Sequence, residues 1–149
     1  MSLQERIMTE MKAAMRAKDT VKLEALRAIK GGILLAQTES AAKEGITEDE
    51  ELKLLQKLVK QRKDSAAIYK EQGREDLAQP ELDQAAVIEE FLPEQLSEVE
   101  IEAKIVAIIA ETGAEGMKDM GKVMGMASQQ LAGKADGKTI SMIVKKKLS

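Results

Sequence analysis

Apolar residues recur along this chain at spacings of three and four positions, which is the period of an amphipathic helix. The first stripe predicts a helix over residues 3–17. A second helix should follow, capped by Asp19 or Thr20, and should run to about Ala42, ahead of Gly45. The chain is therefore predicted to begin with two consecutive helices.

Two adjacent glycines, Gly31 and Gly32, lie inside this second helix. Each costs a helix about 1 kcal/mol relative to Ala. The pair therefore indicates that a neighbouring helix packs closely or that the helix kinks, with a binding role as a further alternative.

Capping signals mark the next helices. Thr47 and Glu50 have the spacing of a capping box, and the helix that they open should end at Gly73. Residues 74–80, which end in a proline, predict only a short turn or helical fragment. A fourth helix should follow them and end before Pro93.

Three further helices are predicted after Pro93. Ser97 and Glu100 repeat the capping-box spacing, and the helix that they open should end at Gly113. A sixth helix should span residues 118–131, and a seventh should follow the glycine-containing loop 133–137. No segment shows the alternating pattern of a strand.

These elements predict an all-α fold in two parts. Residues 1–93 should form an N-terminal helical bundle, and residues 94–149 a smaller three-helix C-terminal domain. Pro93 is the predicted boundary, because it ends one helix and the next capping box follows it.

The composition excludes several classes of function. The 149 residues include no Cys and no His, so a thiol nucleophile, a Ser–His relay and thiolate or imidazole metal ligands are excluded. Tyr69 and Phe91 alone are too few to form a platform for stacking single-stranded bases. No apolar run reaches the roughly 18 residues of a membrane span, and no secretory leader is evident. We therefore expect a cytoplasmic protein with no membrane partner.

The net charge of −3 hides an uneven distribution. Residues 74–116 hold 12 acidic and 2 basic side chains, whereas residues 117–149 hold 7 basic and 2 acidic ones. Such a basic segment can bind a phosphate backbone through counterion release, without reading its sequence. Its candidate RNA contacts are Lys118, Lys122, Lys134, Lys138, Lys145, Lys146 and Lys147. The last three also suit the C-terminal end of a helix without any ligand.

Gly121 and Gly125 lie four residues apart on the predicted sixth helix. On its own, this spacing favours close packing of a neighbouring helix. The alternative is that a smooth strip lets an RNA backbone approach, with Lys122 beside it as a phosphate contact.

The run from Gly133 to Thr139 approaches the pattern of a phosphate loop. The pattern needs a glycine where this chain has Ala132, and the segment before it is predicted to be a helix instead of a strand. The run therefore predicts an interhelical turn, in which Gly133 caps the sixth helix and Asp136 caps the seventh.

Clustered carboxylates, at residues 48–51 and at Glu89 and Glu90, offer a further alternative, a carboxylate metal site. The first cluster lies at a helix N-terminus, where acidic side chains suit the helix dipole. Helical di-metal sites also use His, which is absent here. We expect no cofactor and no metal.

Three segments are distinctive as a set: 92–97 (LPEQLS), 119–125 (DMGKVMG) and 133–137 (GKADG). Together they resemble the YqeY family of small bacterial proteins. Residues 3–15, the capped start at 47–52 and the run 60–65 are similar too, so the likeness covers essentially the whole chain.

The resemblance implies an all-helical protein whose second part is similar to the tail domain of the B subunit of aspartyl/glutamyl-tRNA amidotransferase. That tail contacts tRNA and performs no chemistry. Its pattern of glycine and lysine residues falls here on Gly121, Lys122, Gly125, Gly133, Lys134, Ala135 and Asp136. The resemblance therefore favours RNA contact at these glycines and lysines.

Three functional hypotheses follow. In the first, the chain is a tRNA-binding or adaptor module with no catalytic residues of its own. In the second, which the family's label of carbon–nitrogen ligase with glutamine as amido donor implies, it is an enzyme or an accessory of amidotransferase subunits. In the third, it is a protein–protein adaptor that uses residues 74–116 or the first bundle. The lack of a nucleotide loop and of a Cys nucleophile argues against complete catalysis by this chain.

Overall fold

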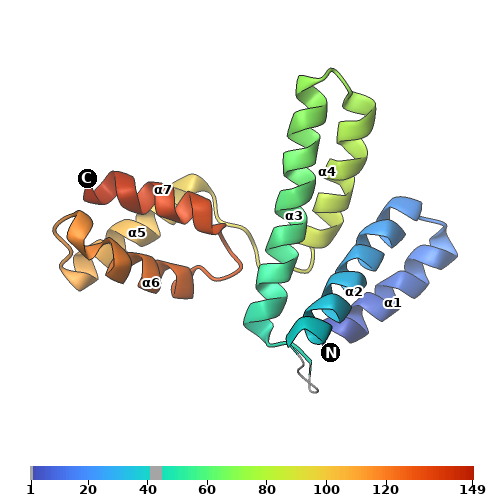
Figure 1. Cartoon of the computed structure of the whole chain (residues 1–149), viewed down its shortest axis with the longest axis horizontal. Helices are drawn as coiled ribbons and strands as arrows, with labels where there is room; N and C mark the ends of the chain where they lie inside the picture. Colours follow the sequence, from blue (N-terminus) through green and yellow to red (C-terminus); the bar gives the residue numbers. More distant parts are fainter. Residues whose placement is uncertain (1, 41–44) are drawn as a thin grey trace. The chain divides into compact units, whose positions relative to one another are not determined.

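We analysed the chain as a computed structural model that describes residues 2–40 and 45–149. The described residues form helices, turns and loops, without a strand, which confirms the predicted all-α fold (Figure 1). The chain divides into two compact units, unit 1 over Met1–Leu92 and unit 2 over Pro93–Ser149. Whether each unit folds independently, as the domain boundary at Pro93 implies, stays a prediction.

Unit 1 begins with α1 (Leu3–Ala17) and α2 (Thr20–Ser40). A capping box opens α1, because Ser2 Oγ accepts a hydrogen bond from Glu5 N and the Glu5 carboxylate accepts one from Ser2 N. The Asp19 carboxylate accepts a hydrogen bond from Lys22 N at 3.1 Å, so Asp19, the first of the two predicted candidates, caps α2. The predicted end of α2 near Ala42 lies outside the described residues.

The hairpin of α3 (Glu48–Glu71) and α4 (Glu75–Glu89) completes unit 1. Thr47 Oγ1 accepts a hydrogen bond from Glu50 N at 3.2 Å, which confirms Thr47 as the N-cap of α3 and supplies one of the two hydrogen bonds of the predicted capping box. Gly73 follows the end of α3 with φ +73°, a left-handed conformation that favours glycine.

The prediction that only a short fragment precedes Pro80 was wrong. Helix α4 begins at Glu75 and continues through Pro80, which is its sixth residue. Proline inside a helix loses one backbone hydrogen bond and costs about 3 kcal/mol. Buried residues on both sides of the proline, Ala78 at 0% exposure and Ala85 at 1%, pack this helix into unit 1. Burial of Ala78 and Ala85 against the rest of unit 1 offsets the free-energy cost of the proline within the helix.

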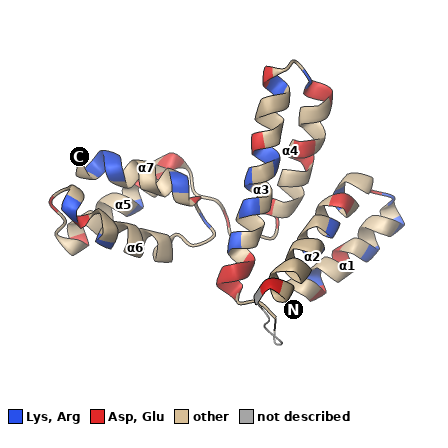
Figure 2. Cartoon of the chain, in the orientation of Figure 1, with Lys and Arg blue, Asp and Glu red and all other residues tan. Residues whose placement is uncertain are grey.

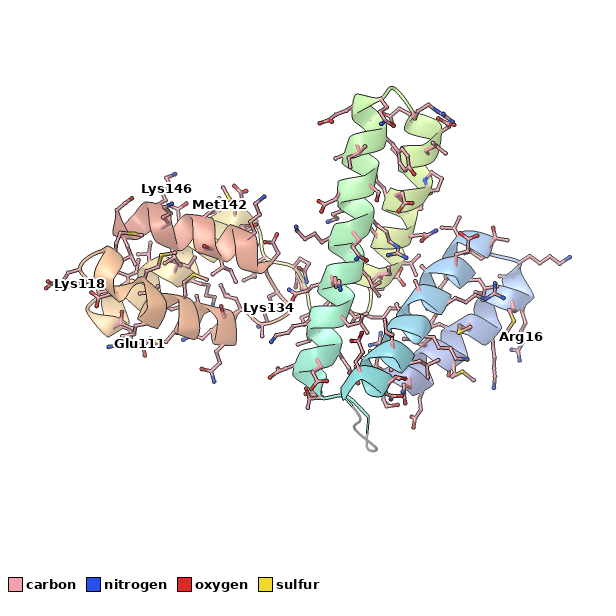
Figure 3. The ribbon with its side chains drawn as sticks, viewed as in Figure 1. Arg16, Glu111, Lys118, Lys134, Met142 and Lys146 are labelled. Atoms are coloured by element: carbon pink, nitrogen blue, oxygen red, sulfur yellow. The ribbon has the colours of Figure 1, made fainter. Side chains whose placement is uncertain are left out.

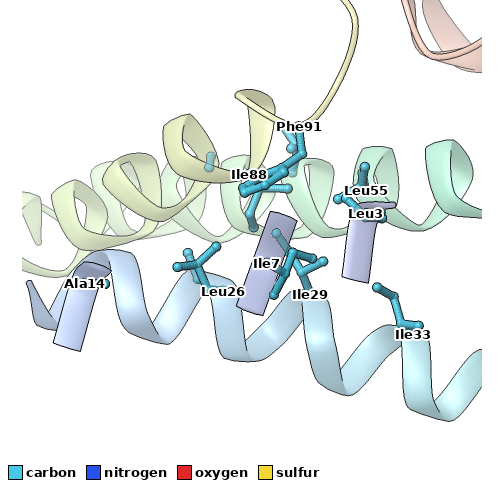
Figure 4. Close-up of a cluster of buried hydrophobic side chains, with 12 residues drawn as sticks. Leu3, Ile7, Ala14, Leu26, Ile29, Ile33, Leu55, Ile88 and Phe91 are labelled. Atoms are coloured by element: carbon cyan, nitrogen blue, oxygen red, sulfur yellow. The ribbon is translucent and has the colours of Figure 1, made fainter. Parts of the chain in front are cut away.

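The core of unit 1 collects apolar side chains from all four helices (Figure 4). Its largest fully buried members are Ile7, Leu26, Ile29, Leu55 and Ile88. A Cβ atom at Gly32 would lie 2.8 Å from Cδ1 of Leu54, whereas one at Gly31 would meet nothing within 4 Å. Close packing of α2 against α3 therefore accounts for Gly32, whereas no neighbour among residues 2–40 and 45–149 accounts for Gly31.

A polar network connects three helices of unit 1. The Arg62 guanidinium donates to the Gln84 side chain at 3.1 Å and to the Leu58 carbonyl at 3.1 Å. The Gln84 amide in turn donates to the Glu24 carboxylate at 3.1 Å. Lys63 pairs with Glu89 at 2.6 Å. Arg62 and Lys63 therefore link α3 to α4, and Gln84 extends this network to α2.

Unit 2 contains α5 (Glu98–Thr112), a short 3₁₀ turn η1 (Met117–Asp119), α6 (Met120–Gln130) and α7 (Gly137–Leu148). The predicted capping box at Ser97 and Glu100 is present, and Gly113 ends α5 with φ +69°. The predicted sixth helix begins as the 3₁₀ turn and becomes α-helical at Met120.

The core of unit 2 is aliphatic. Its buried members come from all three helices and the α6–α7 loop: Ile101, Ile105, Ile108, Val123, Ala127, Leu131, Ala135, Ile140, Val144 and Leu148. The segment before α5 is tied to this core, because Leu96 N donates to the Lys134 carbonyl at 2.9 Å. The three helices therefore form one small bundle with a fixed α6–α7 loop.

Candidate nucleic-acid interface

The candidate RNA contacts lie on η1, α6, the α6–α7 loop and α7. Asp136 begins α7, and its carboxylate accepts hydrogen bonds from Thr139 N at 2.7 Å and Thr139 Oγ1 at 3.0 Å. This confirms the predicted cap and places Lys138 in the first turn of α7. The segment before it is helical, so this loop is an interhelical turn and lacks the strand of a phosphate loop.

One exposed row runs along α7. Lys138, Met142, Lys145 and Lys146 lie at spacings of three, four and seven, so they share a helix face. All four are exposed, Met142 to 63%. We call these four residues the α7 row; its members Met142 and Lys146 lie on the outer side of α7 in Figure 3. The opposite face of α7 is buried in the core.

The lysines of the α7 row are not held in ion pairs within the described residues, although the charge of Lys146 acts on the Glu102 carboxylate at longer range. In residues 2–40 and 45–149, no ion pair involves Lys138, Lys145 or Lys146. Lys147 differs, because its ammonium pairs with the Glu102 carboxylate of α5 at 2.5 Å. That hydrogen bond holds the pKa of Glu102 below its ordinary value. Lys147 therefore links α7 to α5, and the row consists of the three lysines and Met142.

The glycines of α6 face outward. Gly121, Lys122 and Gly125 are all exposed, on the side opposite the buried Val123 and Ala127. A Cβ atom at Gly121 or Gly125 would meet nothing within 4 Å in the described structure. The spacing suggested packing of a neighbouring helix, and that interpretation was wrong within unit 2. We call Gly121, Lys122 and Gly125 the α6 face.

The remaining candidates do not join these two surfaces. Lys118 lies in η1, at the opposite end of α6 from Lys134 (Figure 3). Gly133 has φ +75° and its carbonyl accepts a hydrogen bond from the Gln95 side chain at 2.7 Å. Lys134 lines a hollow of about 300 Å³ that Glu100 and Lys104 also line. Gly133 and the backbone of Lys134 therefore have roles within unit 2 that need no ligand.

The charge of unit 2 is divided between its helices. Helices α6 and α7, which carry basic residues, pack against α5, whose carboxylates include Glu98, Glu100, Glu102 and Glu111 (Figure 2). Residues 93–149 contain eight basic and eight acidic side chains in total. The basic segment therefore belongs to a neutral unit, and any attraction for an anion depends on local surfaces such as the α7 row.

Sequence reasoning missed two residues of this surface. Met142 falls outside the apolar stripe of Ile140, Val144 and Leu148, and that position could have identified it as exposed. Glu102 carries no comparable signal, because its pairing with Lys147 depends on how α5 packs against α7. Within the described ranges, no group of three or more acidic side chains is arranged to hold a metal ion, and no helix is long and apolar enough to cross a membrane.

The whole chain matches a known protein family. The family described as "Yqey-like protein" matches residues 4–148. The chain belongs to the YqeY family. The resemblance drawn from the LPEQLS, DMGKVMG and GKADG motifs is thereby confirmed.

Members of two groups of proteins are similar to this YqeY-family chain. A glutamyl-tRNA(Gln) amidotransferase subunit from Thermococcus gammatolerans is 35% identical over 109 residues, which cover 70% of this chain and 17% of that protein. The protein called "altered inheritance of mitochondria protein 41, mitochondrial" from Pyrenophora tritici-repentis is 32% identical over 133 residues, 87% of this chain and 71% of that protein. Its counterpart from Meyerozyma guilliermondii is 31% identical over 125 residues, 80% of this chain and 64% of that protein.

The chain therefore spans about a sixth of the amidotransferase subunit that it matches. The similarity relates this chain to one part of that subunit. The mitochondrial relatives also mean that the predicted cytoplasmic location stays a prediction.

Proposed function

We propose that this YqeY-family protein binds RNA and that the α7 row contacts the phosphate backbone. The observation that carries the proposal is the row itself. Three lysines without ion pairs in the described residues lie along one exposed face of a rigidly packed helix. Lysine is a mobile point charge that contacts phosphates without reading bases.

The geometry of the row favours a folded RNA. Lys138 and Lys145 are seven residues apart, so about 10 Å of helix separates them. Lysines at that separation, with Lys146 beside them, can contact more than one phosphate. Tyr69 and Phe91, the only aromatic residues, belong to unit 1. Unit 2 therefore has no aromatic side chain on which to stack an unpaired base.

Transfer RNA is the RNA class that we propose. The support is the similarity of this chain to part of a glutamyl-tRNA(Gln) amidotransferase subunit. In addition, the α6 face offers open space beside Lys122, where a backbone can approach without meeting a side chain at Gly121 or Gly125. We propose the α6 face as a second contact for the same RNA.

Salt-dependent binding of bulk tRNA to the full chain tests the proposal. The triple variant Lys138→Glu, Lys145→Glu, Lys146→Glu should lose binding, and at each salt concentration its affinity should lie far below that of the unaltered protein. Counterion release predicts that the slope of log affinity against log salt falls by about 0.7–0.9 for each phosphate contact removed.

A matched control keeps the same charge change on unit 1. Lys53, Lys57 and Lys70 are exposed lysines of α3, and no ion pair to any of them occurs in the described ranges. Their triple replacement by Glu should leave the affinity within about twofold of the unaltered protein. Equal loss in both triple variants would mean that total charge, and not the α7 row, determines binding.

The similarity to an amidotransferase subunit also favours a second candidate function, that of an accessory to amidotransferase subunits. The carbon–nitrogen ligase label then belongs to the assembly, because this chain has neither Cys nor a nucleotide loop. The purified chain, added to a glutamine-hydrolysing subunit, should raise the conversion of glutamyl-tRNA(Gln) to the amide. If glutamyl-tRNA(Gln) is not converted by the chain alone or by the chain with the glutamine-hydrolysing subunit, this candidate function is rejected. The RNA-binding proposal would not be affected by that result.

A further inference from the structure

An apolar hollow opens between α1 and α2 on unit 1. It measures about 210 Å³ and is lined by Gln4, Ile7, Met8, Lys30, Ile33 and Leu34. Ile7 and Ile33 form its floor, at 1% and 3% exposure. Met8 and Leu34 form its mouth, at 47% and 52% exposure. Two large apolar side chains thus remain half in water beside a space that a partner's side chain can fill.

The same surface continues along the α1–α2 hairpin. Lys12 and Met15 follow Met8 by four and seven residues, so the three share one face of α1. Lys30 and Arg27 precede Leu34 by four and seven residues on α2. Because α1 and α2 are antiparallel neighbours (Figure 1), we infer that these residues continue the surface around the hollow along the hairpin. We call this surface, with the hollow, the α1–α2 groove.

The border of the α1–α2 groove is basic. Lys12, Arg27 and Lys30 are exposed, and none of them has an ion pair within residues 2–40 and 45–149. Glu5, three residues before Met8, is the nearby opposing charge on α1, and its carboxylate accepts a hydrogen bond from Ser2 N at 3.3 Å. The groove therefore combines an apolar floor with an excess of positive charge along its edges.

We propose that the α1–α2 groove docks an amphipathic helix of a partner protein that carries acidic residues beside its apolar stripe. Hydrophobic grooves commonly bind such a helix, and the apolar residues that enter the groove recur along it at intervals of about one turn. Met8 and Met15 are flexible apolar side chains that can adapt to such anchors. Lys12, Arg27 and Lys30 select acidic flanks by charge complementarity.

A protein helix fits the α1–α2 groove better than RNA does. Leu34, Met8 and the hollow that they border offer an apolar anchor site, whereas contacts to an RNA backbone are made to phosphates and sugars and leave such an apolar hollow unfilled. The proposal goes beyond RNA binding, because the α1–α2 groove and the α7 row belong to different units.

Methyl-methionine NMR on the full chain tests this inference. The probes are two synthetic helical peptides with the same Leu stripe at positions i, i+4 and i+7, one with Glu and one with Lys beside the stripe. The Glu peptide should shift the methyl signals of Met8 and Met15 and leave that of Met142 unchanged. The Lys peptide should bind at least about tenfold more weakly, because it places like charges against the basic border.

Matched variants distinguish peptide binding at the α1–α2 groove from non-specific binding elsewhere on the chain. Leu34→Glu should weaken the Glu peptide by about tenfold, the usual size of a lost apolar anchor combined with a like charge. Ile68→Glu changes an α3 residue of similar exposure, 54% against 52%, and should leave affinity within about twofold. Lys30→Glu and Lys70→Glu form the second matched pair of variants. Affinity for the Glu peptide should fall only in Lys30→Glu. Far-UV circular dichroism checks that each variant keeps its helices.

Several outcomes would overturn the inference. They are equal binding of both peptides, equal loss in Leu34→Glu and Ile68→Glu, or no binding of the Glu peptide at about 1 mM. Shifts of Met8 on adding tRNA without peptide would make the groove an RNA surface. Self-association that Leu34→Glu abolishes in sedimentation would assign the groove to a second copy of the chain. Loss of tRNA binding in the α7-row variant leaves the peptide-binding readouts unaffected, so the two proposals fail separately.

Discussion

Replacing Gly125 by Ala should raise the stability of unit 2 and weaken tRNA binding at the same time. Gly125 is the sixth residue of α6, and a Cβ atom there would meet nothing within 4 Å in the described structure. Ala is favoured over Gly in a helix interior by about 1 kcal/mol, and no steric cost opposes this gain. For a unit of this size, such a gain raises the melting temperature by about 4–8 °C. The same methyl group stands where we propose that the RNA backbone approaches.

Gly31→Ala is the matched control. Gly31 lies in the interior of α2, and a Cβ atom there would also meet nothing within 4 Å among the described residues, so the same substitution should stabilise unit 1 by about 1 kcal/mol. It should leave tRNA affinity unchanged, because Gly31 belongs to neither the α6 face nor the α7 row. The fluorescence of Tyr69, on α3, follows the unfolding of unit 1, and methyl-methionine signals of α6 and α7 follow unit 2. If each variant changes the melting temperature of only the unit that carries the substitution, that result would also support independent folding of the two units.

Two results would refute this reasoning. If Gly125→Ala lowers the stability of unit 2, the exposed face of α6 is packed against something and the open space assigned to it is wrong. If Gly125→Ala and the larger Gly125→Leu both stabilise unit 2 and leave tRNA affinity unchanged, the glycines do not serve an RNA backbone. Binding would then be confined to the α7 row.

Three further predictions follow from local geometry. Pro80→Ala should stabilise unit 1 by about 1–3 kcal/mol in chemical denaturation, because it restores a helical hydrogen bond; an unchanged midpoint would mean that the helix begins only after residue 80. Asp136→Ala should cost unit 2 about 1 kcal/mol as a lost N-cap, measured by thermal unfolding, and a value near zero would contradict that role. Lys147→Ala should raise the pKa of Glu102 in an NMR titration, and more than Lys146→Ala does.

The pH dependence of the Lys147–Glu102 pair has a definite sign. The hydrogen bond from Lys147 lowers the pKa of Glu102 in the folded chain relative to its ordinary value of 4.5. The stability that this pair contributes is therefore present above that ordinary pKa and is lost as the pH falls through the lower folded value. Titration of Glu102 at the same pH in the Lys147→Ala variant and in the unaltered protein would contradict the assignment.

Helix boundaries set by local chemistry could be predicted from the sequence. Ser97 with Glu100, Thr47 and Asp19 act through hydrogen bonds to backbone groups within three residues, so their spacing alone identifies them. Helix α4 could not be predicted in this way. Its passage through Pro80 depends on burial of Ala78 and Ala85 against other helices, which no local signal encodes.

The candidate site could be predicted only as a charged segment. The sequence located the lysines of residues 117–149, but not their separation into the α7 row, the ion-paired Lys147 and the loop at Lys134. Glycine spacing on α6 suggested helix packing, because the spacing alone does not distinguish an inward strip from an outward one. The apolar residues Val123 and Ala127, each two positions from a glycine, place the glycines on the opposite face of the helix, and their burial confirms this orientation.

The methyl signal of Met142 during a tRNA titration tests the central claim most directly. Met142 lies within the α7 row and is 63% exposed, whereas Met8 lies on unit 1 and is 47% exposed. We predict that tRNA shifts or broadens the Met142 signal at low salt, that added salt restores it, and that Met8 stays unchanged. An unchanged Met142 signal while tRNA binds, or a response at Met8 alone, would contradict RNA binding by the α7 row.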